Sequence, residues 1–130
     1  MQTEKLKVRP GVQSYRELLV WQKSIDLCEN CYRFTSRLPK EEVYGLSSQI
    51  RRASVSVPSN IAEGFARENK GTFVHHLRIS QGSLKELETQ LVICQRVGLA
   101  TDRDVGPLLS IADEVGKMIR SLVRSLQDSR

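Results

Sequence analysis

The chain has 130 residues, a formal net charge of +5 and a pI near 9.4, with 39% hydrophobic and 27% charged residues. One domain of this length can bury about two-thirds of its unfolded surface, so it needs neither a structural metal nor disulfides to fold. The absence of a membrane-length apolar run and the polar start argue against a membrane partner and predict a cytoplasmic protein, while the moderate positive excess is compatible with a polyanionic partner.

The first predicted helix runs from about Glu17 to Arg37 and ends before Pro39. Residues 1–13 are expected to form a flexible basic tail, and residues 14–128 the folded domain. Ser14 and Glu17 resemble a capping box, so the first turn is expected to begin slightly earlier. Two apolar stripes lie side by side along this helix. The first holds Leu18, Trp21, Ile25, Cys28, Tyr32 and Thr35, and the second Val20, Leu27, Cys31, Phe34 and Leu38.

The second predicted helix begins near Tyr44 to Leu46 and continues to about Arg67. Pro58 lies inside it, and because proline lacks an N–H and its ring collides with the carbonyl four residues back, a kink is expected there. A turn is expected at residues 69–71. The apolar seam is Leu46, Ile50, Ala53, Val57, Asn60 or Ile61, Gly64 and Phe65.

The third helix, about Thr72 to Val97, keeps an unbroken heptad rhythm, and Gly98 ends it. Thr101 and Asp104 offer a cap for the fourth helix. The Gly-Pro pair at residues 106–107 is expected to bend this helix or delay its start. Short connections between long helices predict an all-α, antiparallel up-down-up-down four-helix bundle. The third seam is Phe73, Leu77, Ser80, Leu84, Leu87, Leu91 and Cys94, and the fourth is Val105, Leu108, Ala112, Val115, Ile119, Leu122 and Leu126.

Residues 53–62 form the most unusual segment, because they contain no charge and almost nothing large. A helix of this composition has little reason to face water, and small residues let another backbone approach closely. The segment therefore predicts packing on more than one side, as in a homo-oligomer of bundles. The candidate interface or polar-network residues are Val55, Pro58, Asn60, Ala62, Glu63 and Ala66.

Asn60 and Glu63 stand three residues apart, so a helix places them on one face. They could belong to a recognition or central-channel surface. Alternatively, they form a buried polar network that fixes register or caps the backbone freed by Pro58. We favour the structural interpretation, because a kinked helix leaves a carbonyl that needs a donor.

The residue types needed for catalysis or metal binding do not come together in this sequence. A di-metal bundle uses Glu-x-x-His pairs, and none occurs. His75 and His76 are adjacent, so a helix aims them about 100° apart, and both are expected to be exposed. Cys28 and Cys31 form a lone C-x-x-C without further ligands, and with Cys94 they are better interpreted as small buried hydrophobes. We expect no enzyme, no metal and no cofactor.

The basic residues are the remaining candidates. Arg51 and Arg52 precede the uncharged segment, and Lys117, Arg120 and Arg124 line one outer face of the fourth helix. These side chains could neutralise phosphates of a nucleic acid. Solvated faces or ion pairs are the alternative for each of them. The aromatic residues Trp21, Tyr32, Phe65 and Phe73 fall on apolar seams, which argues against base stacking.

Several sequence blocks follow one another in a fixed order over residues 18–100. They are Leu19–Lys23, Leu38–Glu42, Gly45–Leu46 with Gln49–Ala53, Pro58 with Asn60–Gly64, and Gly82–Leu91. Together they resemble the 23S ribosomal RNA intervening-sequence protein family, with a looser match in the last helix.

The resemblance implies a four-helix bundle that assembles as a homopentamer around a central channel. Proteins similar to this one are encoded within insertions in bacterial 23S ribosomal RNA genes and at unrelated loci. A related branch is the accessory variability protein of diversity-generating retroelements, a basic protein that works with a reverse transcriptase and its RNA. Five copies would multiply the moderate charge fivefold and so strengthen the field around the particle.

Two functions remain open at this point. The first is a non-enzymatic, homo-oligomeric nucleic-acid-binding protein, with RNA as its expected ligand, that contacts the phosphate backbone through basic faces. The second is a protein-interaction scaffold, such as a reverse-transcriptase accessory subunit. Nuclease-resistant capture of one protein would favour the second.

Overall fold

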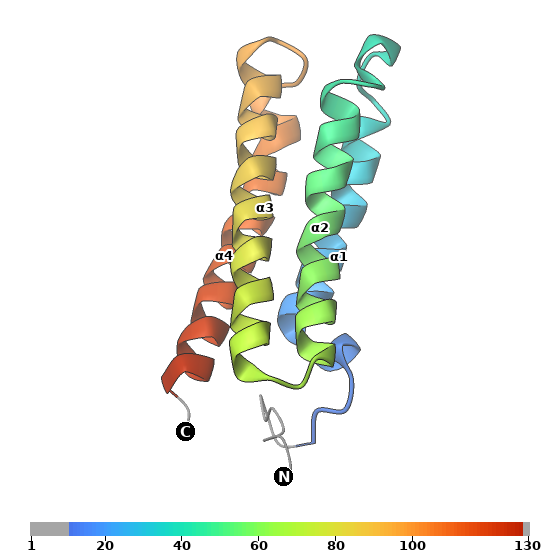
Figure 1. Cartoon of the computed structure of the whole chain (residues 1–130). Coiled ribbons are helices and arrows are strands. Elements are labelled where there is room, and N and C mark those ends of the chain that lie inside the picture. The colour runs from blue at the N-terminus through green and yellow to red at the C-terminus, as the bar shows by residue number, and fades with distance from the viewer. Residues whose placement is uncertain (1–10, 129–130) are drawn as a thin grey trace.

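The computed structural model describes residues 11–128, which contain four α-helices, two short 3-10 helices and no strand (Figure 1). The greater part of the predicted tail, residues 1–10, lies outside the described residues. The elements are η1 (Tyr15–Glu17), α1 (Leu19–Thr35), η2 (Lys40–Glu42), α2 (Leu46–Ala66), α3 (Lys70–Arg96) and α4 (Asp102–Asp128).

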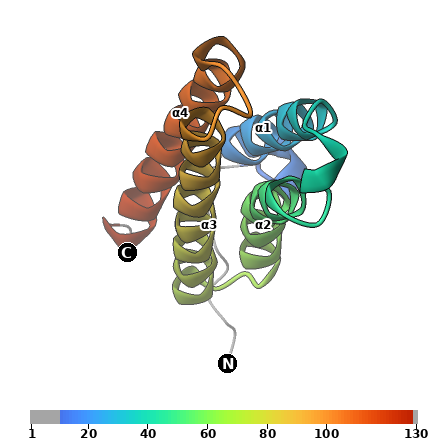
Figure 2. The ribbon, with the colours of Figure 1, turned by 90° about the horizontal axis from the view of Figure 1, so that it is seen from above.

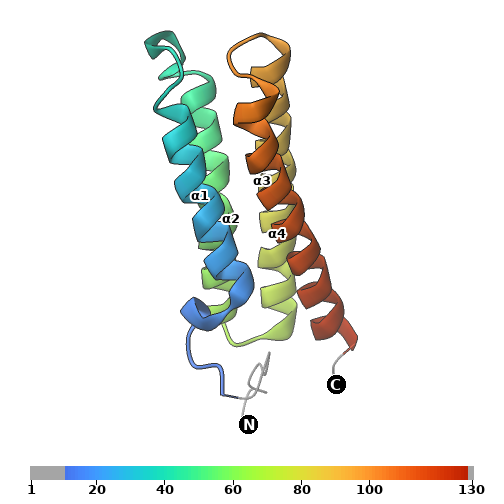
Figure 3. The ribbon, with the colours of Figure 1, turned by 180° about the vertical axis from the view of Figure 1, so that it is seen from behind.

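The four helices pack as a bundle in which each contacts two neighbours, in the cyclic order α1, α2, α3, α4. Figure 2, which looks down on the molecule, shows α1 and α2 beside each other, with α3 and α4 completing the group. The α1–α2 and α3–α4 connections lie at one end of the bundle, and the α2–α3 connection lies at the other (Figures 1 and 3). The all-α bundle expected from the sequence is thus observed.

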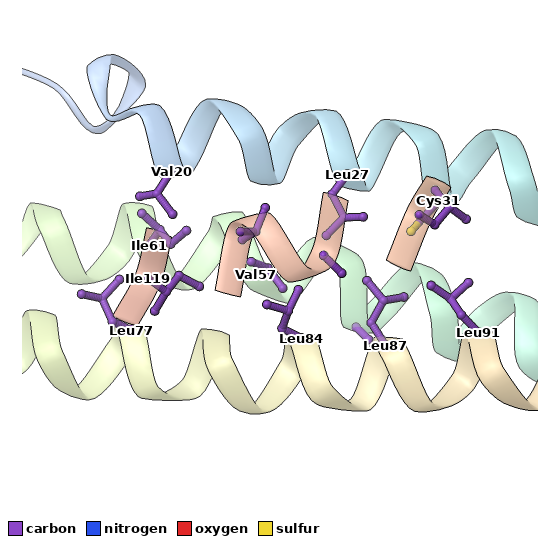
Figure 4. Close-up of a cluster of buried hydrophobic side chains, with 14 of the residues drawn as sticks. Val20, Leu27, Cys31, Val57, Ile61, Leu77, Leu84, Leu87, Leu91 and Ile119 are labelled. Carbon is purple, nitrogen blue, oxygen red and sulfur yellow. The ribbon is translucent and has the colours of Figure 1, made fainter. Parts of the chain in front are cut away.

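The core fills the space between the helices with side chains from all four (Figure 4). The predicted seam of α3 is confirmed, because every one of its positions is buried. In α4 the seam is confirmed except near its end, where Val123 is buried and Leu122 is only half-buried. The labelled core residues are Val20, Leu27, Cys31, Val57, Ile61, Leu77, Leu84, Leu87, Leu91 and Ile119.

The two stripes of α1 have different environments. The stripe through Leu27 and Cys31 faces the core and is buried from Val20 to Phe34, with Leu38 half-buried at its end, whereas Ile25 and Cys28 in the middle of the other stripe are half-buried. Tyr32 is exposed. The expectation that Cys28 lies in the core is therefore wrong. Cys31 occupies that place instead, because α1 is turned so that its second stripe meets α2 and α4.

The helix ends differ in detail from the predictions. Ser14 accepts a hydrogen bond from Arg16 N (3.1 Å) and begins η1, and the extended backbone of Leu18 separates this turn from α1. Asn69 caps α3 by accepting from Thr72 N (2.9 Å), so the residues expected to extend the turn, Lys70 and Gly71, are already helical.

The α4 helix is not delayed by its Gly-Pro pair, because it begins at Asp102 and continues through Pro107. A reciprocal capping box stabilises this start. Asp104 N donates to Thr101 Oγ1 (3.2 Å), while Thr101 N donates to Asp104 Oδ2 (3.0 Å). In α2, Pro58 is buried inside a continuous helical segment, and the bend predicted there stays a prediction.

Candidate nucleic-acid interface

Arg51 lies in the second turn of α2 and is held in place by two residues of α1. Its Nε donates a hydrogen bond to Thr35 Oγ1 (2.7 Å), and its guanidinium carbon stands 4.6 Å from the centre of the Tyr32 ring. A cation over an aromatic face is attracted by the ring quadrupole. The head group is therefore pre-positioned, and within the described residues its two terminal nitrogens make no hydrogen bond.

A groove of about 620 Å³ opens beside Arg51, between the end of α1, η2 and the start of α2. Its lining includes three cationic side chains and no carboxylate, and hydroxyl groups form much of the rest. Such a surface favours an anionic ligand. The lining residues are Tyr32, Thr35, Ser36, Leu38, Lys40, Val43, Tyr44, Ser47, Ser48, Arg51, Arg52 and Val55.

Arg52 and Lys40 share this groove with Arg51. Both are exposed, and neither side chain forms a hydrogen bond or ion pair with any residue from 11 to 128. Sequence reasoning identified the two arginines but missed Lys40, whose position depends on the η2 turn and not on helical spacing.

Aromatic residues also belong to this groove, which corrects the expectation from the sequence. Tyr44 is 96% exposed and Tyr32 is 40% exposed, and both line the groove with the arginines. The sequence pattern places Tyr32 on an apolar seam and Tyr44 at the start of the second helix, and neither position predicts a ring in a basic groove. The argument against base stacking therefore does not hold for Tyr44, whereas the guanidinium of Arg51 stands over the ring of Tyr32.

The second predicted basic group lies elsewhere. Lys117, Arg120 and Arg124 are exposed along the C-terminal half of α4, and Lys117 Nζ pairs with Asp113 Oδ2 at 3.3 Å. The α4 helix ends at the opposite end of the bundle from the start of α2 (Figure 1). The structure thus does not bring the two predicted groups into one site.

A second basic groove, between α1 and the start of α4, was not predicted. Arg33, Arg37 and Arg103 contribute to its lining, although Arg33 is paired with Glu29 at 3.0 Å. This groove also contains Asp104, whose pKa is lowered by its hydrogen bonds to Thr101 and by the two nearby arginines, 37 and 103. The carboxylate makes it a weaker anion site than the groove beside Arg51.

Asn60 takes part in a polar network between α2 and α3. Its amide nitrogen donates to Ser56 O (3.0 Å), and its Oδ1 lies 3.0 Å from His76 Nδ1. Ser56 and Ser83 share a further hydrogen bond of 2.7 Å. His76 is consequently half-buried, not exposed as predicted, whereas His75 is exposed. Asn60 contacts the carbonyl of Ser56 and not that of the residue four positions before Pro58.

The other candidate residues of α2 lie apart from this network. Glu63 is exposed and pairs with Arg67 at 3.0 Å, so it does not join Asn60. Ala62 is half-buried, and Val55 and Ala66 are exposed. These three residues form a largely uncharged strip on the outer side of the helix.

The cysteines do not form a reactive or metal-binding cluster. Burial, and to a lesser extent the neighbouring Cys28, raises the pKa of Cys31 to about 12. Burial also raises the pKa of Cys94, with a smaller contribution from the charge of Glu42. Among residues 11–128, no three His, Cys, Asp or Glu side chains gather as metal ligands, and none of the helices has the length and hydropathy to cross a bilayer.

Comparison with known proteins relates the chain to one family. Residues 16–121 match the family model described as 23S rRNA-intervening sequence protein. A similar solved structure is the crystal structure of a protein of unknown function from the S23 ribosomal protein family of Bacteroides thetaiotaomicron. It is 22% identical with a TM-score of 0.76, over 82% of this chain and 96% of that one, a likeness that shows the fold alone. No curated protein matches the chain.

Proposed function

The chain belongs to the 23S rRNA-intervening sequence protein family, and on this basis we propose that it is a non-enzymatic, homo-oligomeric nucleic-acid-binding protein whose ligand is RNA. The observation that supports this most directly is the groove lined by Lys40, Arg51 and Arg52 without any carboxylate. These cations would contact phosphates, and the exposed basic residues of α4 would extend the contact to the other end of the bundle.

Binding of this kind depends on salt. Each phosphate neutralised by a lysine or arginine releases condensed counterions, so the logarithm of the affinity falls linearly with that of the salt concentration, by roughly 0.9 per phosphate contact on a duplex. Because the proposed contacts are made to the backbone, charge reversal should weaken binding to all sequences alike.

The test is a salt series of affinities for structured RNA of the 23S type and for matched duplex DNA, using the purified oligomer. A steep negative slope and a preference for RNA are the expected results. Arg52→Glu and Arg124→Glu should each weaken binding, whereas Lys85→Glu should have a smaller effect, because Lys85 is already paired with Glu88 at 3.1 Å. Absence of binding at low salt would overturn the proposal.

Self-assembly is the second part of the proposal. The outer side of α2 carries Val55, Ala62 and Ala66 and lacks charge in its middle, which supports contact with a second copy. We propose a pentamer, from the family resemblance, whose bundles have antiparallel helices and an α2 bent at Pro58.

Ala62→Glu should dissociate this assembly and leave a helical monomer, since it places a charge within the contact. The mass in solution, measured by light scattering, and the circular dichroism spectrum report the two effects. Gln127→Glu, at an exposed position near the end of α4, is the matched control. If the Ala62→Glu variant remains an oligomer, the proposal that α2 forms the contact between copies is contradicted.

A protein-interaction scaffold, such as a reverse-transcriptase accessory subunit, is the alternative function. It is favoured by one observation, the exposed apolar residues Ile79 and Ile93 along α3 and Val97 directly after its end. Capture of one protein that survives nuclease treatment and is lost in Ile93→Asp would support the scaffold over the nucleic-acid function.

A further inference from the structure

We propose that the groove between α1 and α2 binds one unpaired nucleotide of an RNA strand, with its base stacked on Tyr44 and its phosphate held by Arg51, Arg52 and Lys40. This proposal rests on the nucleic-acid function proposed above and deepens it. Backbone contact alone needs only cations, whereas this groove combines cations with an aromatic ring that has almost no protein contact of its own.

Tyr44 is placed where a base could reach its face. The ring is 96% exposed, and the neighbouring Val43 is 50% exposed, so an apolar lip stands beside the cationic lining. Every base offers a π-face, and stacking on an aromatic side chain tolerates any sequence. Tyr32 cannot serve equally, because the guanidinium of Arg51 already stands over its ring.

The backbone around Tyr44 is held in place before any ligand arrives. Val43 N donates to Lys40 O (3.1 Å), and Gly45 N donates to Glu42 O (3.0 Å). The carboxylate of Glu42 accepts from Leu46 N (3.2 Å) at the start of α2. The segment that presents the ring is therefore tied on both sides of Tyr44, which lowers the ordering cost of binding.

The cationic side chains that would hold the phosphate are also available before a ligand binds. Arg51 is fixed by Thr35 and Tyr32 and keeps its two terminal nitrogens available. Arg52 and Lys40 have no partner among the described residues. Glu42 also belongs to this turn, but its carboxylate accepts a hydrogen bond from Leu46 N at the start of α2 and does not line the groove.

The size of the groove and the exposed ring of Tyr44 favour an unpaired nucleotide over a duplex. A volume of about 620 Å³ lies within the roughly 300–1,000 Å³ typical of small-molecule sites. Inside a duplex each base is stacked between its neighbours, so its faces are not available to Tyr44. Loops and single-stranded ends can extend a base onto an aromatic side chain.

The experiment measures fluorescence anisotropy of a labelled single-stranded oligoadenylate and of a blunt RNA duplex with the same number of phosphates. The proteins are the full chain and its Tyr44→Leu, Tyr44→Phe and Arg52→Gln variants. Tyr44→Leu should weaken single-strand binding by about tenfold, the effect of losing one stacked base, and leave duplex binding unchanged. Tyr44→Phe should retain the affinity for the single strand, and Arg52→Gln should weaken the binding of both the single strand and the duplex.

Each other outcome counts against the proposal in a distinct way. Equal single-strand affinity of wild type and Tyr44→Leu, with salt-dependent duplex binding intact, would overturn the stacking site and leave the proposed function standing. No binding of either RNA would overturn both. Adenosine monophosphate that competes as tightly as the oligoadenylate would show a free-nucleotide site and overturn the assignment to a strand. Because Tyr44 is almost fully exposed, its variants should fold as wild type does.

Discussion

The backbone of Gly64 in α2 lies directly against His76 of α3: a Cβ added at Gly64 would stand 2.7 Å from the His76 Cβ. The same atom would also come within 3.0 Å of Phe73 Cδ1. The two helices approach this closely only because residue 64 has no side chain. The Asn60–His76 hydrogen bond lies one turn away and depends on the same approach.

Gly64→Ala should therefore destabilise the fold, because overpacking a helix contact costs about 1–3 kcal/mol and exceeds the gain in helix propensity. Urea unfolding followed by circular dichroism measures the change. Gly82→Ala is the matched control, since its Cβ would meet nothing within 4 Å in the middle of α3. It should stabilise by about 0.5–1 kcal/mol. Equal effects of the two substitutions would contradict the close approach.

Removing the polar group from either of two buried residues of α3 should change the free energy of unfolding, and the two changes should have opposite signs. Gln90 Oε1 is buried without a hydrogen-bond partner among the described residues, and its amide nitrogen makes only a 3.5 Å contact with Gln49. Gln90→Leu should stabilise the fold by about 1 kcal/mol, because an orphaned acceptor is removed. Ser80 Oγ donates to Val57 O at 2.9 Å, so Ser80→Ala should cost about 1 kcal/mol. Denaturant unfolding of both variants checks the signs.

Heptad spacing was sufficient to predict the buried face of α3, because one apolar seam continues in heptad rhythm along the whole helix. The other apolar residues of α3, such as Ile79 and Ile93, do not continue as a second seam and are exposed. It was insufficient for α1. Both stripes of that helix are apolar, so periodicity could not decide that Leu27 and Cys31 meet the core while Ile25 and Cys28 stay half-buried. That choice depends on the rotation of α1 against α2 and α4.

The candidate site was predictable only in part. Arg51 and Arg52 stand out by composition, since they border the uncharged segment. Their association with Lys40 and Tyr44 depends on the η2 turn, which reverses the chain between α1 and α2 and has no periodic signal. Long-range partners such as Thr35, which is 16 residues from Arg51, also require the packed helices.

The cysteines should differ sharply in reactivity toward an alkylating reagent. The thiolate is the reactive form, and the rise of the Cys31 pKa from 9.0 to about 12 lowers its thiolate fraction roughly thousandfold at any pH well below 9. Cys94 is also fully buried with a raised pKa. Iodoacetamide should therefore modify the half-buried Cys28 first, as read by peptide mass mapping, and the others only after denaturation. Equal labelling of Cys28 and Cys31 in the native protein would contradict the assigned core.

The start of α4 should make stability depend on acid pH. Hydrogen bonds from Thr101 hold the pKa of Asp104 below its usual range, with Arg37 and Arg103 acting in the same direction. A carboxylate with a lowered pKa in the folded state stabilises the fold above its unfolded value, about 3.9, and loses that contribution as pH falls through the folded pKa.

Asp104→Asn should thus reduce the free energy of unfolding at neutral pH, and its difference from wild type should shrink as the pH falls below about 4. Urea unfolding of both proteins from pH 7 to pH 3 measures this difference. Thr101→Ala should produce a similar pattern, because it removes the hydroxyl that caps the helix and binds the same carboxylate. A difference between wild type and Asp104→Asn that stays constant over this range would show that the carboxylate charge does not stabilise the start of α4.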